Sequence, residues 1–334
     1  MPVELATESV EPHGRTATQH AALIFNPAAG GGRLRGQIHH LEEAQKILSR
    51  SHIETTLLTT GEPGDATEFA KQCVTDGYDL VIASGGDGTV NEVVNGLAGS
   101  NVPLAVFPSG TANVLAKELR IPWDVRRAAE LVPRSQPRRI ALGVLSYLDA
   151  PLPPRYFLCL GGAGPDGVLV YSVDLSTKVT AGILAYWWEG ARQLMRYTFP
   201  HFRVTSQGRD LMASLVVVGR TRSYGGPFEI TTGASLFEDM FEIVAVTTRS
   251  PFVFVTLMPS LWLGRLRSRS DVHAWKTTAL RCETVAPAGA SNGTAPPKVY
   301  AQIDGEPAGR LGVEFRIQPS ALTLMVPDPA PPGR

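Results

Sequence analysis

The chain has 334 residues, of which 43% are hydrophobic and 19% charged, and this length and composition suit about two globular domains. Its 31 lysine and arginine residues balance its 31 acidic residues, so bulk positive charge does not mark it as a nucleic-acid binder. Its three cysteines are too few for a disulfide framework, which favours a reducing compartment such as the cytoplasm.

Residues 1–18 are polar and aperiodic, and we expect a loose tail there. They lack the basic start and the apolar run of a signal peptide. The longest apolar stretch, 251–263, is interrupted by Pro259 and Ser260 and is too short to span a bilayer, so no transmembrane segment is predicted. The protein is expected to be cytoplasmic, with any contact to a membrane confined to its surface.

Strand and helix patterns alternate between residues 19 and 137, which predicts an α/β domain with a parallel sheet. Asp65 is followed three residues later by Glu68, a spacing typical of a helix N-cap with a capping box. The predicted strands are 21–25, 53–59, 80–83 and 102–107. The apolar spacing predicts helices around 34–48, 65–74 and 90–97, and a further one that begins near 113.

From 138 to 320 the pattern changes to short strands separated by turn residues, which predicts a β-sandwich domain. The predicted strands are 138–147, 155–160, 215–218, 228–231, 241–247, 279–284, 298–303 and 312–318. Helical candidates at 180–197 and 251–266 interrupt this pattern, and 286–297 has the composition of a flexible loop. Residues 321–334 form a C-terminal segment, and its return to the first domain is left open.

A glycine-rich turn follows the third predicted strand and precedes a helix: Ser84-Gly85-Gly86-Asp87-Gly88-Thr89-Val90-Asn91-Glu92. Glycines let backbone N–H groups approach a ligand closely, and the N-terminus of a helix favours phosphate. A carboxylate inside such an anion site is costly unless a cation joins it. Asp87 therefore suggests Mg²⁺ held together with the phosphates of a nucleotide.

Two further turns are expected at the same edge, because adjacent parallel strands bring their C-terminal loops together. They are Asn26-Pro27-Ala28-Ala29-Gly30-Gly31-Gly32 after the first strand and Pro108-Ser109-Gly110-Thr111-Ala112-Asn113 after the fourth. An acidic tripeptide, Asp304-Gly305-Glu306, follows the predicted strand 298–303. From the sequence alone this tripeptide is a hairpin turn as readily as it is part of the site.

Several other chemistries lack their motifs. The chain has no lysine-bearing phosphate loop, no protein-kinase catalytic loop and no serine-nucleophile elbow. Its seven histidines and three cysteines show no metal-ligand spacing, which argues against a zinc site.

The ordered set of motifs resembles the diacylglycerol kinase / sphingosine kinase catalytic-domain family, including the bacterial-type lipid kinases. The resemblance runs over about residues 20–325, and its Gly-Gly-Asp-Gly-Thr element alone is shared with NAD kinases and phosphofructokinases. The motifs are Asn26-Pro27 with the following glycine, the segment 84–97, Gly110-Thr111-Ala112-Asn113, Gly162-Ala163-Gly164-Pro165-Asp166 and Asp304-Gly305-Glu306.

This resemblance implies ATP-dependent phosphoryl transfer to a lipid hydroxyl, most simply that of a diacylglycerol-like lipid, in a cleft between an NAD kinase/diacylglycerol kinase-like α/β domain and a β-sandwich. By position Glu306 would be the proton acceptor, with Asp304 and Asp87 as the other catalytic carboxylates. The implied cofactors are ATP, as a substrate, and Mg²⁺. The implied nucleotide-binding residues are Asn26, Thr60, Gly85, Gly86, Asp87, Gly88, Thr89, Val90, Asn91, Gly110 and Thr111.

The resemblance also implies a second Mg²⁺ in the β domain. Its ligands would be the Asp239 side chain and main-chain carbonyls nearby, with Leu236, Asp239 and Phe241 as the matching positions. Met240 stands where the family usually has glycine, Val114 where many bacterial members have Asp, and Ala29 where a serine is common. These departures concern metal binding and one hydroxyl donor.

Two apolar segments followed by arginines, 183–188 and 252–263, are candidates for contact with a lipid presented at a membrane surface. Helices packed on the β domain are the simpler interpretation of both. The sequence leaves open which lipid is phosphorylated and whether the chain forms a homodimer. Two other functions stay open: an NAD kinase-like small-molecule kinase, which would share the glycine turn, and a non-catalytic nucleotide-binding regulator, suggested by Val114 and Ala29.

Overall fold

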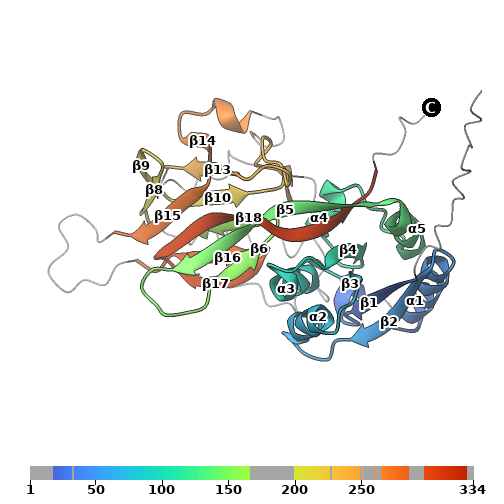
Figure 1. Cartoon of the computed structure of the whole chain (residues 1–334). Helices are drawn as coiled ribbons and strands as arrows, with labels where there is room; N and C mark the ends of the chain where they lie inside the picture. The colour runs from blue at the N-terminus through green and yellow to red at the C-terminus, as the bar shows by residue number, and fades with distance from the viewer. Residues whose placement is uncertain are drawn as a thin grey trace, which may run out of the picture.

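The computed structural model describes residues 18–31, 34–165, 199–225, 228–248, 250, 260, 265–285 and 297–328. They form an α/β region and a β region that lie end to end (Figure 1). Among these residues, no helix has the length and apolarity needed to cross a bilayer. The predicted tail at 1–18, the helices at 180–197 and 251–266, the loop at 286–297 and the end of the chain beyond 328 lie wholly or mostly outside the described residues.

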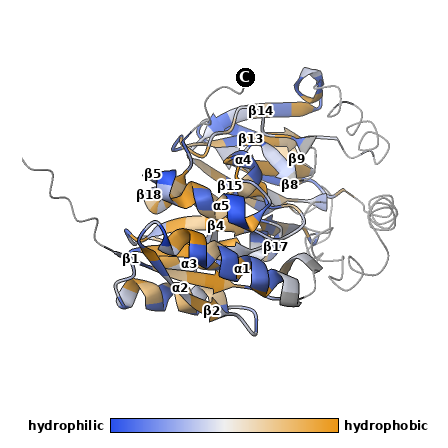
Figure 2. Cartoon of the chain, turned by 90° about the vertical axis from the view of Figure 1, so that its right-hand side faces the viewer, coloured by the Kyte–Doolittle hydropathy of each residue, from blue (hydrophilic) through white to orange (hydrophobic). Residues whose placement is uncertain are grey.

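The α/β region is built on four parallel strands: β1 (Gln19–Phe25), β2 (Ile53–Thr59), β3 (Leu80–Gly85) and β4 (Pro103–Pro108). Their order in the sheet is β2-β1-β3-β4. The apolar runs of β1, β3 and β4 are buried, because helices cover both faces of the sheet (Figure 2). This arrangement confirms the predicted parallel α/β fold.

The helices follow the strands in alternation. They are α1 (Leu34–Ser49), α2 (Asp65–Thr75), α3 (Asp87–Leu97), α4 (Val114–Glu118) and α5 (Val125–Leu131). Helix α1 packs against α5, and α2 packs against α3 on the other face of the sheet. Short 3-10 turns lie at Ala29–Gly31, Val132–Arg134 and Leu266–Ser268.

The predicted capping box at Asp65 is wrong. Asp65 is the first residue of α2, and Gly64 precedes it with a φ of 98° and no side-chain cap. The Asp65 carboxylate instead accepts hydrogen bonds at Oδ2 from the backbone N–H groups of Gly61 (2.7 Å) and Glu62 (2.9 Å), which lower its pKa. Asp65 therefore stabilises the turn before the helix, a role that its spacing from Glu68 does not predict.

Two long strands carry the sheet from the α/β region into the β region. β5 (Gln136–Tyr147) and β18 (Val313–Val326) are antiparallel partners, and Thr323 and Leu324 of β18 pair with Pro103 and Leu104 of β4. The other strands of this ten-stranded sheet are β6 (Arg155–Phe157), β8 (Phe202–Ser206), β9 (Arg209–Ala213) and β15 (Ala279–Thr284). The predicted domain limits at 137 and 320 fall within these long strands and stay predictions.

A second, six-stranded sheet packs against this part of the first. Its order is β14-β13-β10-β7-β16-β17, and all its neighbours are antiparallel. The bounds are β7 (Leu160–Ala163), β10 (Leu215–Gly219), β13 (Phe241–Val246), β14 (Val272–Thr277), β16 (Tyr300–Ile303) and β17 (Glu306–Arg310). A short pair, β11 (Ser223–Gly225) with β12 (Phe228–Glu229), stands apart.

The core of the sandwich contains an aromatic cluster that joins the two sheets. The ring of Phe157 stacks on that of Phe241 with centroids 5.7 Å apart, and meets the edge of Phe315 at 5.9 Å. All three side chains are fully buried. Because β6 and β18 belong to one sheet and β13 to the other, this packing confirms the predicted β-sandwich.

The predicted strand 155–160 is in fact two strands in different sheets. β6 pairs with β5, and β7 pairs with β10 and β16. The chain crosses from one sheet to the other at Leu158 and Cys159, whose backbone N–H groups make no ladder bond and turn toward a buried carboxylate, Asp304.

Candidate active site

Three turns meet at the carboxyl edge of the parallel sheet, as the alternating pattern predicts. They follow β1, β3 and β4, whose ends are level in the register: Phe25 pairs with Ser84, and Gly85 with Pro108. The backbone continues this alignment one residue further, since Asn26 N donates to Ser84 O (3.0 Å) and Ser109 N to Gly85 O (3.0 Å).

Glycine is required where these turns touch. A Cβ at Gly30 would lie 2.0 Å from the carbonyl oxygen of Ser109, and Gly30 has a φ of +81°. A Cβ at Gly110 would lie 2.5 Å from the Cα of Gly86. The first and third turns, and the second and third, are therefore in direct backbone contact.

Two asparagine side chains hold the first and third turns in place. Asn26 donates from Nδ2 to the Thr89 hydroxyl (2.9 Å), which joins the first turn to the second. Asn113, with a φ of 43°, donates from Nδ2 to Gly110 O (2.7 Å) and accepts from Gly110 N (3.2 Å) at Oδ1. The third turn is thus a closed loop held by its own asparagine.

Asp87 begins helix α3, where the positive end of the helix dipole faces the turns. Its Oδ1 accepts a hydrogen bond from Val114 N (2.7 Å). Burial raises the pKa of the Asp87 carboxyl, and the negative charge of Asp304 adds to this shift. No cation is among the groups that act on it, so Asp87 is a buried acid without a compensating charge among the described residues.

Asp304 lies in a tight turn between β16 and β17, with φ values of 46° at Asp304 and 79° at Gly305. The acidic tripeptide is therefore a hairpin turn, and it also lies beside the glycine-rich turns at the edge of the parallel sheet. Asp304 Oδ2 accepts from Asn91 Nδ2 (2.8 Å), a residue of α3 that is 213 positions away in the sequence.

Three backbone N–H groups complete the environment of Asp304. Leu158 N donates to Oδ2 (2.7 Å), while Cys159 N (2.9 Å) and Leu160 N (2.8 Å) donate to Oδ1. A carboxylate has about four lone-pair positions, and all are used here. Burial raises the pKa of Asp304 while these hydrogen bonds oppose the shift.

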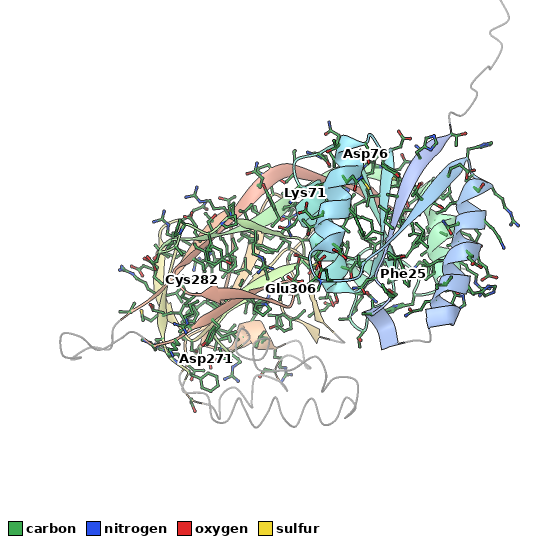
Figure 3. All side chains as sticks on the ribbon, turned by 90° about the horizontal axis from the view of Figure 1, so that it is seen from below. Phe25, Lys71, Asp76, Asp271, Cys282 and Glu306 are labelled. Carbon is green, nitrogen blue, oxygen red and sulfur yellow. The ribbon has the colours of Figure 1, made fainter. Side chains whose placement is uncertain are left out.

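Glu306 is the first residue of β17 and reaches back over the glycine turn. Its Oε1 lies 3.2 Å from the position that a Cβ would take at Gly88. Its Oε2 accepts from Arg155 Nη2 (2.7 Å), and Arg155 Nη1 donates to Pro307 O (2.7 Å). Figure 3 shows Glu306 where the two regions meet.

The environment of Glu306 is partly open. The Glu306 and Arg155 side chains are each 31% exposed. Burial raises the pKa of Glu306, the charge of Arg155 lowers it, and Asp304 and Glu92 raise it further. A carboxylate with this balance of charges can accept a proton from a bound alcohol.

The remaining residues predicted to contact a nucleotide differ in burial and in backbone hydrogen bonding. Thr60 is buried, and its N–H donates to Phe25 O (2.9 Å) at the end of β1. The Thr111 side chain is exposed in the third turn. Val90 has its side chain in the core and its N–H bonded to Gly86 O (3.1 Å). Val90 is therefore poorly suited to contact a nucleotide.

The predicted second metal position does not have a fitting set of donors. The Leu236 carbonyl accepts from Arg220 Nη2 (2.7 Å), the Asp239 side chain is exposed, and Phe241 is paired with Thr277 in the sheet. Among the described residues, no group of three or more His, Cys, Asp or Glu side chains could hold a metal ion. The donors at this loop fit a guanidinium rather than Mg²⁺.

Sequence reasoning gave no role to two arginines of this part of the molecule, Arg155 and Arg220. Arg155 contacts Glu306 across 151 positions of sequence, and Arg220 is fully buried. No spacing marks either residue. The one signal is an arginine that follows the apolar run 215–218 after a single glycine, which is unusual enough to raise the question of its partner.

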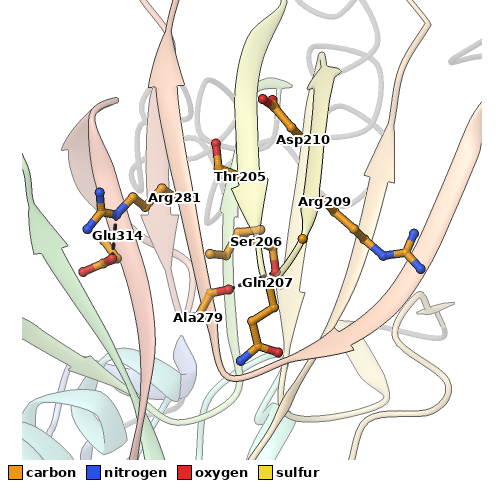
Figure 4. A pocket seen from close by; sticks show the side chains of 10 residues that line it. Thr205, Ser206, Gln207, Arg209, Asp210, Ala279, Arg281 and Glu314 are labelled. Carbon is orange, nitrogen blue, oxygen red and sulfur yellow. Dashed lines mark hydrogen bonds and ion pairs between the residues drawn. The ribbon is translucent and has the colours of Figure 1, made fainter.

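A surface hollow of about 430 Å³ lies elsewhere, between the β8–β9 hairpin, β15 and β18 (Figure 4). An ion pair between Arg281 Nε and Glu314 Oε1 (2.8 Å) forms one wall. None of the predicted site residues lines it, so it plays no part in the site at the glycine turns.

Two family models match the chain. The diacylglycerol kinase catalytic domain covers residues 20–145, and the YegS C-terminal NAD kinase beta sandwich-like domain covers residues 162–326. The chain is 31% identical over 304 residues to a diacylglycerol kinase of Bacillus subtilis (strain 168), with 89% of this chain and 93% of the relative covered. It is 30% identical over 301 residues to a diacylglycerol kinase of Staphylococcus aureus (strain MRSA252), with 89% of each covered.

Solved structures share the fold. A crystal structure described provisionally as a diacylglycerol kinase from Bacillus anthracis str. Sterne has a TM-score of 0.75 and 22% identity, with 96% of this chain and 99% of that chain covered. A second structure, of a diacylglycerol kinase from the same organism, has a TM-score of 0.67 and 20% identity, with 95% and 99% covered.

Proposed function

The chain belongs to the diacylglycerol kinase catalytic-domain family, and on this basis we propose that it is an ATP-dependent kinase that phosphorylates a lipid hydroxyl. Diacylglycerol is the first acceptor to test, because the similar proteins from B. subtilis and S. aureus are named for it. The observation that carries the proposal is the position of Glu306, whose Oε1 lies 3.2 Å from a Cβ placed at Gly88. A carboxylate from the β region thus faces a phosphate-type turn of the α/β region.

Glu306 is the proposed proton acceptor. An alcohol is a weak nucleophile, and a carboxylate within hydrogen-bond reach takes its proton as the oxygen–phosphorus bond forms. The bond from the γ-phosphorus to the β–γ bridging oxygen breaks in the same transfer, and ADP leaves. The partial exposure of Glu306 leaves room for the acceptor hydroxyl on its solvent side.

The first turn of α3 is the proposed phosphate cradle. The N–H groups of Asp87, Gly88 and Thr89 begin the helix and have no carbonyl one turn back to bond. Helix N–H groups and the helix dipole together stabilise phosphate charge. Asn26, bonded to Thr89, and Gly110, against Gly86, hold the two flanking turns in place around this point.

Asp87 is the described residue that best fits Mg²⁺ bound together with ATP. Its carboxyl is buried beside Asp304, and no cation among the described residues offsets it. When bound, Mg²⁺ supplies positive charge to the phosphoryl group in transfer. Asp304, whose oxygens are filled by four N–H donors, instead serves as a positioning residue that fixes the hairpin from which Glu306 projects.

The lipid acceptor is proposed to reach the site from a membrane surface while the protein stays cytoplasmic. The segments 183–188 and 252–263, which the sequence suggests for this contact, lie outside the described residues. The proposal therefore rests on the chemistry of the acceptor and on the family.

An acceptor panel tests this function. Purified protein is given labelled ATP and Mg²⁺ with diacylglycerol, monoacylglycerol, a sphingoid base and phosphatidylglycerol in mixed micelles, and with NAD in solution. We expect a labelled lipid product from at least one micelle, and none when Asp87 is replaced by Asn. Transfer to NAD alone would identify a small-molecule kinase, and ATP binding without any transfer would identify a non-catalytic regulator.

A further inference from the structure

Arg220 is a cation enclosed in the β region. It directly follows β10, its side chain is fully buried, and it is the largest such side chain among the described residues. Burial lowers its pKa to about 10, so it remains charged at neutral pH. A buried charge of this kind is costly unless oriented dipoles or an opposite charge compensate it.

The hydrogen bonds that compensate this charge come from one loop, residues 235–240. Arg220 Nη2 donates to Leu236 O (2.7 Å), and Nη1 donates to Glu238 O (3.2 Å). The charges of Asp239 and Asp304 also favour the guanidinium. Of the positions that the family resemblance assigned to Mg²⁺ at this loop, Leu236 therefore gives its carbonyl to the guanidinium, and Asp239 acts on the guanidinium through its charge.

Two more cations hold the same loop from outside. Lys276 Nζ donates to Glu238 Oε2 (2.5 Å), and the Arg138 guanidinium lies 3.9 Å from the ring centroid of Phe237. The loop thus carries one cation beneath it and two at its surface. A divalent ion at this loop would have to displace the Arg220 guanidinium, because that group already occupies the Leu236 and Glu238 carbonyls.

We propose that Arg220 is a built-in replacement for a structural metal ion, so that the 235–240 loop is held by a guanidinium and needs no divalent cation. This assignment does not depend on the kinase function.

The position of Arg220 gives the replacement a consequence for the site. Arg220 N and Thr221 N both donate to Cys159 O (2.8 and 3.3 Å), and Cys159 N donates to Asp304 Oδ1 (2.9 Å). The guanidinium of Arg220 thus anchors the loop, while the backbone N–H of the same residue bonds to the segment that holds the acidic hairpin. Arg220 thereby connects the loop to Asp304 in two hydrogen-bond steps.

The test uses the full chain without nucleotide and follows thermal unfolding. We expect the melting temperature to change by less than about 1 °C between EDTA and millimolar Mg²⁺, since a ligand stabilises only when it binds the folded state. Asp239→Asn is measured in parallel. A Mg²⁺-dependent rise that disappears in Asp239→Asn would overturn the proposal, whereas a rise that persists in that variant comes from another site and leaves the loop metal-free.

A second arm tests the guanidinium itself. Arg220→Met nearly keeps the side-chain volume but removes the donors to the buried Leu236 carbonyl and the partly buried Glu238 carbonyl, and we expect the melting temperature to fall by roughly 5 °C or more. The matched control is Arg222→Met, an exposed arginine two positions on whose guanidinium forms a surface ion pair with Glu229, and it should change little. Equal melting temperatures for Arg220→Met and the wild type would contradict the proposal; should Arg220→Met fail to fold, the Mg²⁺ comparison still decides.

Discussion

At the scale of single residues, the proposed role of Glu306 as proton acceptor depends on its protonation state. Burial and the neighbouring carboxylates of Asp304 and Glu92 raise the pKa of Glu306, while Arg155 lowers it. Only the ionised form can take a proton from an alcohol, so activity should rise with pH through the pKa of this group. Arg155 thereby keeps Glu306 available as a base at a lower pH than burial alone would allow.

Replacement of Arg155 by Met should move the acid limb of the kcat/KM profile to higher pH. The direction follows because loss of the guanidinium leaves burial and the two carboxylates to favour the protonated acid. The measurement is kcat/KM against pH for both proteins. An unshifted limb with a uniformly lower rate would mean that Arg155 only positions Glu306 and does not set its charge.

Asp304 should matter more for stability than for proton transfer. Asp304→Asn turns an amide NH₂ toward backbone N–H donors, and we expect a loss of about 3 kcal/mol in the free energy of unfolding. Denaturant unfolding measures it, with Asp76→Asn as control, since Asp76 is exposed at the end of α2. If Asp304→Asn unfolds like the wild type, the four-donor arrangement is not what holds the hairpin.

Sequence reasoning found Glu306 and Asp87 by motif but not what surrounds them. The pairing of Asn91 with Asp304 spans 213 positions, and that of Arg155 with Glu306 spans 151. Neither has a local pattern, because such contacts are set by how the two regions dock. The partners of these carboxylates, and hence the directions of their pKa shifts, could be found only from the fold.

At the scale of elements, the glycines let the backbones of neighbouring turns contact one another. Gly30→Ala would place a methyl carbon 2.0 Å from Ser109 O at a φ of +81°, so the first and third turns must separate. We expect ATP affinity to fall at least roughly tenfold and stability to fall by about 1–3 kcal/mol. Titration with ATP and denaturant unfolding check the two effects.

The control for this change is Gly36→Ala in helix α1, where a Cβ meets nothing within 4 Å. Alanine in a helix is favoured over glycine by about 0.5–1 kcal/mol, so the control should be slightly more stable and bind ATP normally. Unchanged ATP affinity in Gly30→Ala would show that the two turns do not need their contact to form the cradle.

Strands buried on both faces were predictable, whereas several short, half-exposed strands were not. β1, β3 and β4 appear in the sequence as continuous apolar runs bounded by glycine or proline. β8, β9, β14 and β17 are only 5 or 6 residues long and mix charged or polar residues with apolar ones, as in Arg209-Asp210-Leu211-Met212-Ala213, and were not predicted. Short antiparallel strands take their stability from neighbours, which the sequence does not display.

At the scale of the whole molecule, β5 and β18 make the two regions one continuous structure. They run antiparallel through both regions, and β18 ends beside β4 of the parallel sheet (Figure 1). The sequence predicts an α/β region followed by a β-sandwich. It does not predict that the two share a sheet, because β18 pairs with strands that lie far apart in the chain. This connection brings the acidic hairpin of one region to the glycine turns of the other.

The most direct test of the proposed role of Glu306 at the glycine turns is the rate of phosphoryl transfer from ATP to diacylglycerol in mixed micelles. This rate is measured for the wild type and for Glu306→Gln, with ATP affinity and melting temperature measured on the same samples. We predict a fall in kcat of about 10²–10⁴-fold in the variant, with unchanged affinity and stability, because only proton acceptance is lost. A variant that turns over at the wild-type rate would contradict the account, since the carboxylate over Gly88 would then have no part in the reaction.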